Sequence, residues 1–142
     1  MNVGHIVTRT LITIASGKTV LDAARLLVSN NVGLLVITQA QDSTRLVGVI
    51  SERDIIRVIA SGRSINTPVD EACTKQPITV QAISDVAEAA KAMNKNRIRH
   101  VVVVDERNKP VGVVSMRDLV GERATLNAIL QSDEKEVFHG AD

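Results

Sequence analysis

The sequence of 142 residues contains the same pattern twice. When it is shifted by 66 positions, residues 3–38 fall on residues 69–104, with matching polarity at most positions. From residue 47 onward the offset is 64, and six of the eight residues in 47–54 are identical to those in 111–118. Polar residues match as well as apolar ones, which argues against a chance similarity of two apolar strands. We therefore infer two copies of one folding unit, a pattern that constrains the fold more than any local signal does.

Each copy has the pattern of a β-α-β-β-α unit. Thr19 is a typical helix N-cap with Asp22 three residues on, and apolar residues then recur at helical spacing. The expected strands are 12–14, 34–37 and 46–50 in the first copy, and 78–80, 101–104 and 110–114 in the second. In the first copy one helix is expected after Thr19 and another from Ser51. In the second copy one helix is expected over 84–96 and another from Ser115. Residues 39–45 are expected as a polar loop, and 105–109 as a hairpin turn.

A single unit of about 60 residues buries little apolar surface for independent stability. Two copies that pack sheet to sheet about a pseudo-two-fold axis remove this difficulty. The expected fold class is α/β (α+β), with two tandem β-α-β-β-α repeats in one globule. We place the first repeat at 1–66, the second at 67–121, and a C-terminal helix extension with a polar tail at 122–142. The apolar edge of the extension packs either within the chain or on a partner subunit.

Composition argues against several classes of function. The formal net charge is +1, whereas a dedicated nucleic-acid binder carries a broad basic surface. Phe138 is the single aromatic residue, so base stacking on aromatic side chains is not expected. The lone Cys73 permits no intrachain disulfide and is expected to be a small buried residue. There is no signal-peptide pattern and no apolar run of the ~20 residues that span a membrane, so we expect a cytoplasmic protein.

The sharpest motif is Gly-apolar-apolar-Ser-x-Arg-Asp, at 48–54 and again at 112–118. In one interpretation it is a capping arrangement, in which the serine and the aspartate three residues on close the start of a helix. In the other it binds a nucleoside phosphate. The hydroxyl and the free amides of the helix N-terminus would then face phosphate, and the aspartate would accept hydrogen bonds from the two hydroxyls of a ribose. Recurrence in both copies favours the second interpretation without excluding the first.

A basic cluster is present in the second copy alone. It consists of Arg97, Arg99 and His100, just before the strand 101–104. The first copy has Asn31, Gly33 and Leu34 at the matching positions. These cations would neutralise phosphate charge beside a helix N-terminus, or they belong to a solvated loop.

No catalytic constellation stands out. The three histidines show no metal-ligand spacing with one another or with Cys73, and no phosphate-binding glycine loop is present. No serine, histidine and acid order suggests a nucleophile. We therefore expect no enzyme activity, no catalytic residue, no metal and no prosthetic group.

These motifs resemble a known family. Thr-Val-x-x-Ala-Ala, then Ile-Arg-His-Val-Val-Val-Val-Asp, then Val-Gly-Val-Val-Ser-x-Arg-Asp-Leu is similar to a pair of cystathionine-beta-synthase (CBS) domains, over roughly residues 3–120. The chain resembles the small stand-alone members of that family. The resemblance implies two clefts between the copies that bind adenine-containing ligands, a flat homodimer, and an effector protein that reads the bound state.

The resemblance also implies the nucleotide-binding residues. The expected contacts are Ser115, Arg117, Asp118, Arg99, His100, Ile98, Thr10, Leu11 and Ile12 in one cleft, and Ser51, Arg53, Asp54, Val32, Gln76, Pro77 and Ile78 in the other. Asp118 and Asp54 would hold ribose, and Arg99 and His100 would contact phosphate. Val32 and Ile98 would form apolar walls for the base. Because the first copy lacks the Arg-His pair, we predict that the Asp118 cleft binds phosphorylated ligands more strongly.

The sequence therefore predicts a non-catalytic regulatory module that binds AMP, ADP or ATP between its repeats and signals to a partner. The alternatives are a structural dimerisation module with no ligand, or a binder of NAD, S-adenosylmethionine or nucleic acid. The basic residues that could serve nucleic acid are Arg97, Arg99, Arg107, Lys109 and Arg117.

Overall fold

The computed structural model describes residues 1–7 and 11–119, and it confirms the β-α-β-β-α order in both copies. The first copy comprises β1 (Thr13–Ala15), α1 (Val20–Asn30), β2 (Leu34–Gln39), β3 (Asp42–Ser51) and α2 (Glu52–Ala60). The second comprises β5 (Thr79–Gln81), α4 (Val86–Asn96), β6 (His100–Val104), β7 (Pro110–Ser115) and the start of a helix at 116–119. Thr10 and the expected extension at 122–142 lie outside the described residues.

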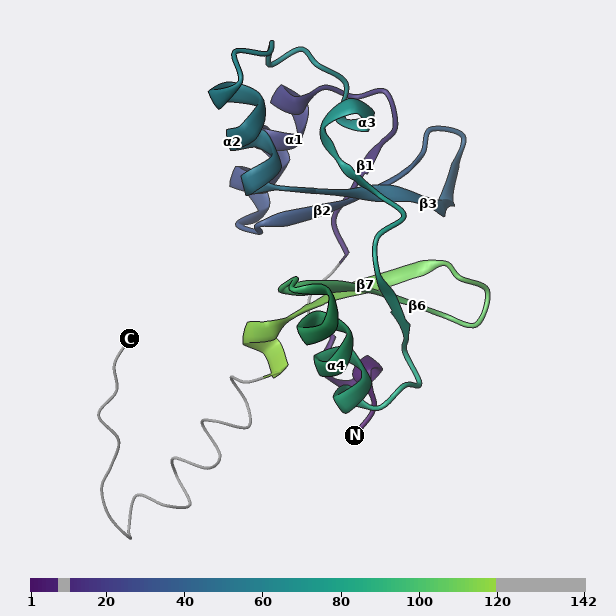
Figure 1. Cartoon of the computed structure of the whole chain (residues 1–142). Coiled ribbons are helices and arrows are strands. Elements are labelled where there is room, and N and C mark those ends of the chain that lie inside the picture. The colour runs from purple at the N-terminus through teal and green to yellow at the C-terminus, as the bar shows by residue number, and fades with distance from the viewer. Residues whose placement is uncertain (8–10, 120–142) are drawn as a thin grey trace, which may run out of the picture.

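The two sheets face each other in the middle of the molecule, and the helices cover their outer faces (Figure 1). The strand orders are β1-β2-β3-β4, where β4 is Thr74–Lys75, and β5-β6-β7. In each sheet the first strand runs parallel to the second, and the next pair is antiparallel. Val36, Val102 and Val104 are buried where the sheets meet. This arrangement confirms the expected fold class and the sheet-to-sheet packing.

The helix ends follow from local residue chemistry. The Thr19 hydroxyl accepts from the Asp22 amide at 3.1 Å, and the Asp22 carboxylate accepts from the Thr19 amide at 3.0 Å, so a capping box starts α1. Asp85 caps α4, which therefore starts at Val86 rather than at residue 84. Both α1 and α4 end at a left-handed residue, Asn31 with φ 53° and Arg97 with φ 54°.

The segment 39–45 is a hairpin rather than a loop. Strand β3 begins at Asp42 and pairs with β2 through a register shift next to Thr38. Polar side chains do not prevent pairing here, because the ladder is made by backbone groups and this end of the hairpin is exposed to solvent.

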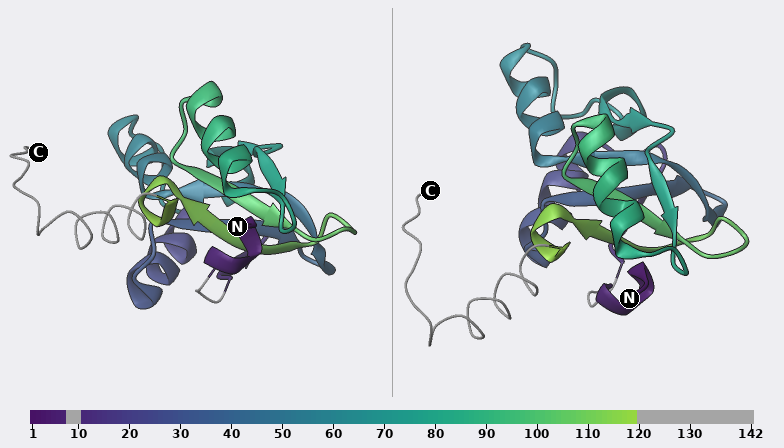
Figure 2. Two further views of the ribbon diagram at one scale, coloured as in Figure 1. Left: turned by 90° about the horizontal axis from the view of Figure 1, so that it is seen from below. Right: turned by 60° about the horizontal axis from the view of Figure 1, so that its bottom comes forward.

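The core of each copy is completed by a short helix that precedes the first strand of the other copy. The short helix η1 (Val3–Ile6) packs beside α4 on the second copy, where Val3 is fully buried (Figure 2). The short helix α3 (Val69–Ala72) packs on the first copy, where Val69 is fully buried. The Val3 amide donates to the Ser84 carbonyl and the Val69 amide donates to the Lys18 carbonyl, both at 2.7 Å. The exchange is therefore symmetric and ties the two copies together.

Asp70 fastens α3 to the first copy. Its carboxylate accepts from the Ser16 hydroxyl and from the Gly17 amide, the latter at 2.7 Å. Burial acts to raise the pKa of Asp70, but these two hydrogen bonds, together with the backbone amide of Asp70 and the charge of Lys75, hold the pKa below its ordinary value. Because the pKa is depressed in the folded state, the ionised carboxylate stabilises the fold above the unfolded pKa. This stabilisation is lost as the pH falls through the folded pKa.

We predict that Asp70→Asn lowers the free energy of unfolding by about 1–2 kcal/mol at pH 7. The deficit should shrink at acidic pH, where the wild-type carboxyl becomes protonated. Urea denaturation at pH 7 and at pH 3 measures both values. Glu71→Gln is the matched control, because Glu71 is exposed and makes only a 3.7 Å ion pair with Arg63. Equal losses for the two variants would contradict the assigned role of Asp70.

Candidate functional site

In each copy the strand pairing places the start of the middle strand next to the serine that opens the Ser-x-x-Asp motif. In the first copy Leu34, which begins β2, lies opposite Ser51, which ends β3. In the second copy His100 lies opposite Ser115 in the same way. We call the group of Gly33, Leu34, Ser51, Glu52 and Asp54 the first-copy site. We call the group of Arg99, His100, Ser115, Met116 and Asp118 the second-copy site.

Each aspartate takes part in a capping arrangement. The Ser51 amide and hydroxyl donate to Oδ2 of Asp54 at 2.9 and 3.1 Å, and the Asp54 amide donates to the Ser51 hydroxyl at 3.3 Å. The Ser115 amide donates to Oδ2 of Asp118 at 2.9 Å, and the Asp118 amide donates to the Ser115 hydroxyl at 3.1 Å. The capping interpretation is therefore seen in both copies, and it uses one carboxylate oxygen, Oδ2.

Most of the first helical amides are already engaged, which corrects the expectation that they are free for phosphate. The Glu52 amide donates to the Gly33 carbonyl at 3.1 Å, and the Met116 amide donates to the Arg99 carbonyl at 2.7 Å. The amides of Asp54 and Asp118 are bound to the serine hydroxyls. The chain caps its own helix starts, so a phosphate at this point would depend on side-chain cations instead.

The remaining carboxylate oxygen differs between the sites. Oδ1 of Asp54 accepts from the Arg57 guanidinium at 3.3 Å, and the Asp54 side chain is only 9% exposed. Asp118 is half-buried, and its Oδ1 has no hydrogen-bond partner among the described residues. The residue that matches Arg57 in the second copy is Gly121, which has no cation to offer. Asp118 is therefore the aspartate with the more available oxygen.

The basic cluster divides into separate roles. Arg97 is the left-handed residue that ends α4 and is exposed, whereas Arg99 is exposed directly beside the Met116 amide. His100 is half-buried, and this burial lowers its pKa below the ordinary value. The charge of Asp118 acts to raise the pKa, Arg99 lowers it, and Glu52 raises it. His100 thus lies within electrostatic reach of both aspartate-bearing helix starts.

The segments expected near the base are partly committed to the sheets. The Ile12 carbonyl accepts from the Val36 amide at 3.2 Å, and the Ile78 carbonyl accepts from the Val102 amide at 3.1 Å. Leu11 packs between the sheets. The other expected contacts lie as follows: Val32 packs on the core of the first copy and Ile98 on that of the second, Pro77 is half-buried, and Gln76, Arg53 and Arg117 are exposed.

Sequence reasoning missed Glu52 and Arg57. A Cβ placed on Gly33 would lie 2.8 Å from Oε1 of Glu52, so this carboxylate lies beside the position that matches the Cβ of Arg99 in the second copy. The signal was present in the repeat itself. Glu52 and Met116 are one of the two differences in an otherwise identical stretch of eight residues.

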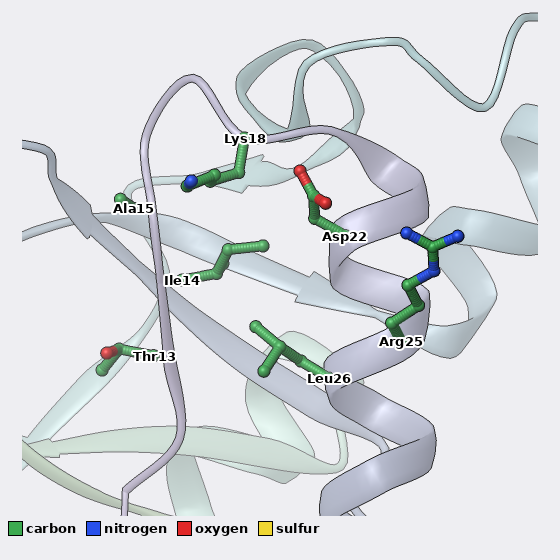
Figure 3. A pocket seen from close by; sticks show the side chains of 7 residues that line it. All are labelled: Thr13, Ile14, Ala15, Lys18, Asp22, Arg25 and Leu26. Carbon is green, nitrogen blue, oxygen red and sulfur yellow. The ribbon is translucent and has the colours of Figure 1, made fainter.

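A pocket of about 400 Å³ lies elsewhere, between β1 and α1 (Figure 3). Its lining residues are Thr13, Ile14, Ala15, Lys18, Asp22, Arg25 and Leu26. None of them belongs to the expected nucleotide contacts, and Asp22 already caps α1.

Two kinds of feature are absent from residues 1–7 and 11–119. This part of the chain holds no group of three or more His, Cys, Asp or Glu side chains placed to bind a metal ion. No helix in it has both the length and the apolar character needed to cross a membrane.

Comparison with known proteins gives one consistent family. The model of the CBS domain matches residues 3–61 and again residues 69–124. An uncharacterized 17.7 kDa protein of Acidianus ambivalens is 35% identical over 117 residues, which cover 82% of this chain and 70% of that protein. The mitochondrial CBS domain-containing protein CBSX3 of Arabidopsis thaliana is 38% identical over 106 residues, which cover 72% of this chain and 51% of that protein.

Solved structures agree with the sequence comparison. A CBS domain protein of Pyrobaculum aerophilum, complexed with AMP, is 36% identical with a TM-score of 0.84, covering 92% of this chain and 99% of that one. The CBS domain pair of protein MJ0100, in complex with 5′-methylthioadenosine and S-adenosyl-L-methionine, is 28% identical with a TM-score of 0.80, covering 89% and 98%.

The lowered pKa of His100 predicts a pH-dependent stability in the absence of ligand. The unfolded state binds a proton at a higher pH than the folded state does, so the free energy of unfolding should fall as the pH drops through about 6.5. The fall should end below the folded pKa. His100→Gln should flatten this part of the curve, whereas the other two histidines remain in both proteins and cancel in the comparison. Urea denaturation between pH 5 and pH 8 measures it, and parallel curves would show that His100 is not the group responsible.

Proposed function

Because the chain belongs to the CBS domain family and carries two CBS domains in tandem, we propose that it is a non-catalytic regulatory module in the cytoplasm that binds an adenine nucleotide and signals to a partner protein. The observation that carries the proposal is the second-copy site. There the register of β6 and β7 places His100 opposite Ser115, and the Arg99 carbonyl holds the first turn of the helix that contains Asp118. The proposed ribose acceptor and the two proposed phosphate-binding residues thus belong to elements that meet at one end of a sheet.

In the proposed complex Asp118 binds the ribose through Oδ1, while Oδ2 keeps the helix capped. Arg99 and His100 bind the phosphate, and phosphate charge favours the protonated form of His100. The Arg117 amide has no partner among the described residues and adds a donor on the same side. Each charge-assisted hydrogen bond of this kind contributes about 1.5–3 kcal/mol.

The base would lie between the copies. In the proposed second-copy cleft it contacts Ile98 and the segment Thr10, Leu11 and Ile12. In the first-copy cleft Val32, Gln76, Pro77 and Ile78 take these positions, with Ser51, Arg53 and Asp54 toward the sugar. The exchange of η1 and α3 supports this assignment. The chain runs from η1, which packs on the second copy, to β1 of the first copy, and from α3, which packs on the first copy, to β5 of the second.

The ligand class is supported by neighbouring structures, one with AMP and one with S-adenosyl-L-methionine and 5′-methylthioadenosine. AMP is our first choice for the second-copy site, since Arg99 and His100 are suited to a single phosphate. ADP, ATP and NAD would need further cations for their additional phosphates. A nucleic-acid ligand is disfavoured by a net charge of +1.

A structural module with no ligand is the second candidate, because the capping boxes alone account for the serines and for one oxygen of each aspartate. Within residues 1–7 and 11–119, Oδ1 of Asp118 has no partner and Arg99 is exposed, and a module with no ligand requires neither feature. This difference separates the two functions experimentally.

We also propose that the chain forms a homodimer through α1 and α2. Ile56 and Ile59 lie three residues apart on α2, and their exposed fractions are 63% and 60%. Val28 on the neighbouring α1 is 82% exposed. Covering these side chains would remove the largest apolar surface on this pair of helices from water.

Calorimetric titration tests nucleotide binding. We expect wild type to bind AMP, and Arg99→Gly, which installs the residue found at the matching first-copy position, to weaken binding at least tenfold. Loss of both Arg99 and His100 contacts corresponds to about 3 kcal/mol, or about a hundredfold. Lys109→Gly, an exposed residue of the β6–β7 turn, is the matched control and should leave the Kd unchanged. Absence of heat and of any thermal shift with AMP, ATP, NAD and S-adenosylmethionine would favour the structural module.

Sedimentation equilibrium tests the dimer. Ile56→Glu places a charge in the proposed interface and should convert the protein to monomer, with a rise in the dimer Kd of at least tenfold. Ile83→Glu is the control, because Ile83 is 78% exposed in the turn between β5 and α4, away from this pair of helices. A dimer that survives Ile56→Glu would place the interface on another surface.

A further inference from the structure

We propose that Glu52 gives the first-copy site a different ligand class, an adenosyl compound with a positively charged group at the 5′ carbon in place of phosphate. The inference rests on the proposed function, since it assumes that Asp54 receives a ribose. It assigns to Glu52 a role as specificity-determining residue, and it makes the two sites of one chain respond to two different ligands.

The backbone and the side chain of the exposed residue Glu52 both lie against Gly33. The Glu52 amide donates to the Gly33 carbonyl at 3.1 Å, which holds the residue against the chain segment that leads into β2. Its Oε1 lies 2.8 Å from the position that a Cβ on Gly33 would occupy. Any side chain at residue 33 would therefore displace this carboxylate. The glycine at position 33 therefore leaves the space that the Glu52 carboxylate occupies.

The matching pair of residues in the second copy carries a positive charge instead of a negative one. Arg99 replaces Gly33 and Met116 replaces Glu52, while the connecting hydrogen bond from the helix amide to the strand carbonyl is retained at 2.7 Å. The same backbone hydrogen bond is thus present in both sites, and the charge carried by these two residues changes from positive in the second-copy site to negative in the first-copy site. His100 is replaced by Leu34, which removes the second phosphate-binding group.

The other charged groups do not cancel this difference. Arg53 and Arg117 are both exposed at matching positions, so each site has one arginine at this position. Arg57 donates to Oδ1 of Asp54 at 3.3 Å and is thereby directed to the proposed sugar position. Glu52 also acts on His100, whose pKa it raises, so its charge reaches the space between the two copies. A phosphate in the first-copy site would meet a pair of residues that carries a carboxylate, whereas the matching pair in the second-copy site carries a guanidinium.

Ligand pairs that differ in one charge test the inference. S-adenosylmethionine and S-adenosylhomocysteine differ in the methyl group that makes the sulfur a cation, and AMP supplies the phosphate. The full chain carrying Arg99→Gly, which weakens the second-copy site, is titrated with each compound. Methyl resonances of Val32 and Ile98 report which site is occupied, because these residues adjoin Gly33 and Arg99 respectively.

We expect S-adenosylmethionine to shift the Val32 resonances and to bind at least fivefold more tightly than S-adenosylhomocysteine, with AMP weaker than both. Glu52→Gln should bring the two sulfur compounds to within twofold of each other. Glu52→Met, the residue of the matching position, should do the same and also improve AMP binding. Thermal unfolding of each variant checks that the fold is retained.

Three outcomes would overturn the inference while leaving the proposed function in place. In the first, Glu52→Gln does not change the ratio of the affinities for S-adenosylmethionine and S-adenosylhomocysteine. In the second, AMP binds at Val32 as tightly as S-adenosylmethionine does. In the third, no adenosyl compound binds at Val32 while AMP still shifts Ile98 in wild type. If no compound shifts either residue in wild type, the proposed function itself fails.

Discussion

The exchange of short helices between the copies is the constraint on which the rest of the structure depends. Val3 and Val69 are fully buried in the copy to which they do not belong by sequence order, and each is held by the same backbone hydrogen bond to a matching carbonyl. Neither outer core is complete without the segment that the other half provides. After each of these helices the chain passes into the other copy, where β1 and β5 join the sheets of the first and the second copy.

The capping box gives each aspartate a fixed orientation. Because Oδ2 is bound to the serine amide, the carboxylate cannot rotate freely, and its second oxygen points in one direction. The two interpretations of the Ser-x-x-Asp motif are therefore compatible, since one oxygen serves the helix and the other is left for a further partner. In the first copy that partner within the chain is Arg57, and in the second the position of Arg57 is held by Gly121.

Much of the fold could be predicted from the sequence because the repeat allowed every local signal to be read twice. The capping box at Thr19, the six expected strands and the sheet-to-sheet packing all followed from it. The helices η1 and α3 were missed because four residues are too few to show helical periodicity, and their stability comes from tertiary burial. The engagement of the helix amides was missed because the Gly33 and Arg99 carbonyls reach them only after β2 and β3, or β6 and β7, have paired. Glu52 was missed because a flexible side chain takes its position from neighbours that sequence spacing does not reveal.

The reciprocal burial of Val3 and Val69 also bears on how such a chain could have arisen. A single ancestral unit would have lacked the segment that closes its own outer core. It could reach a complete structure only as a pair of identical molecules that traded their first residues, a form of domain swapping. Fusion of two such genes would then have turned an exchange between molecules into one within a molecule. Once joined, the halves would be free to differ, and one now has an arginine and a histidine where the other has a glycine and a leucine.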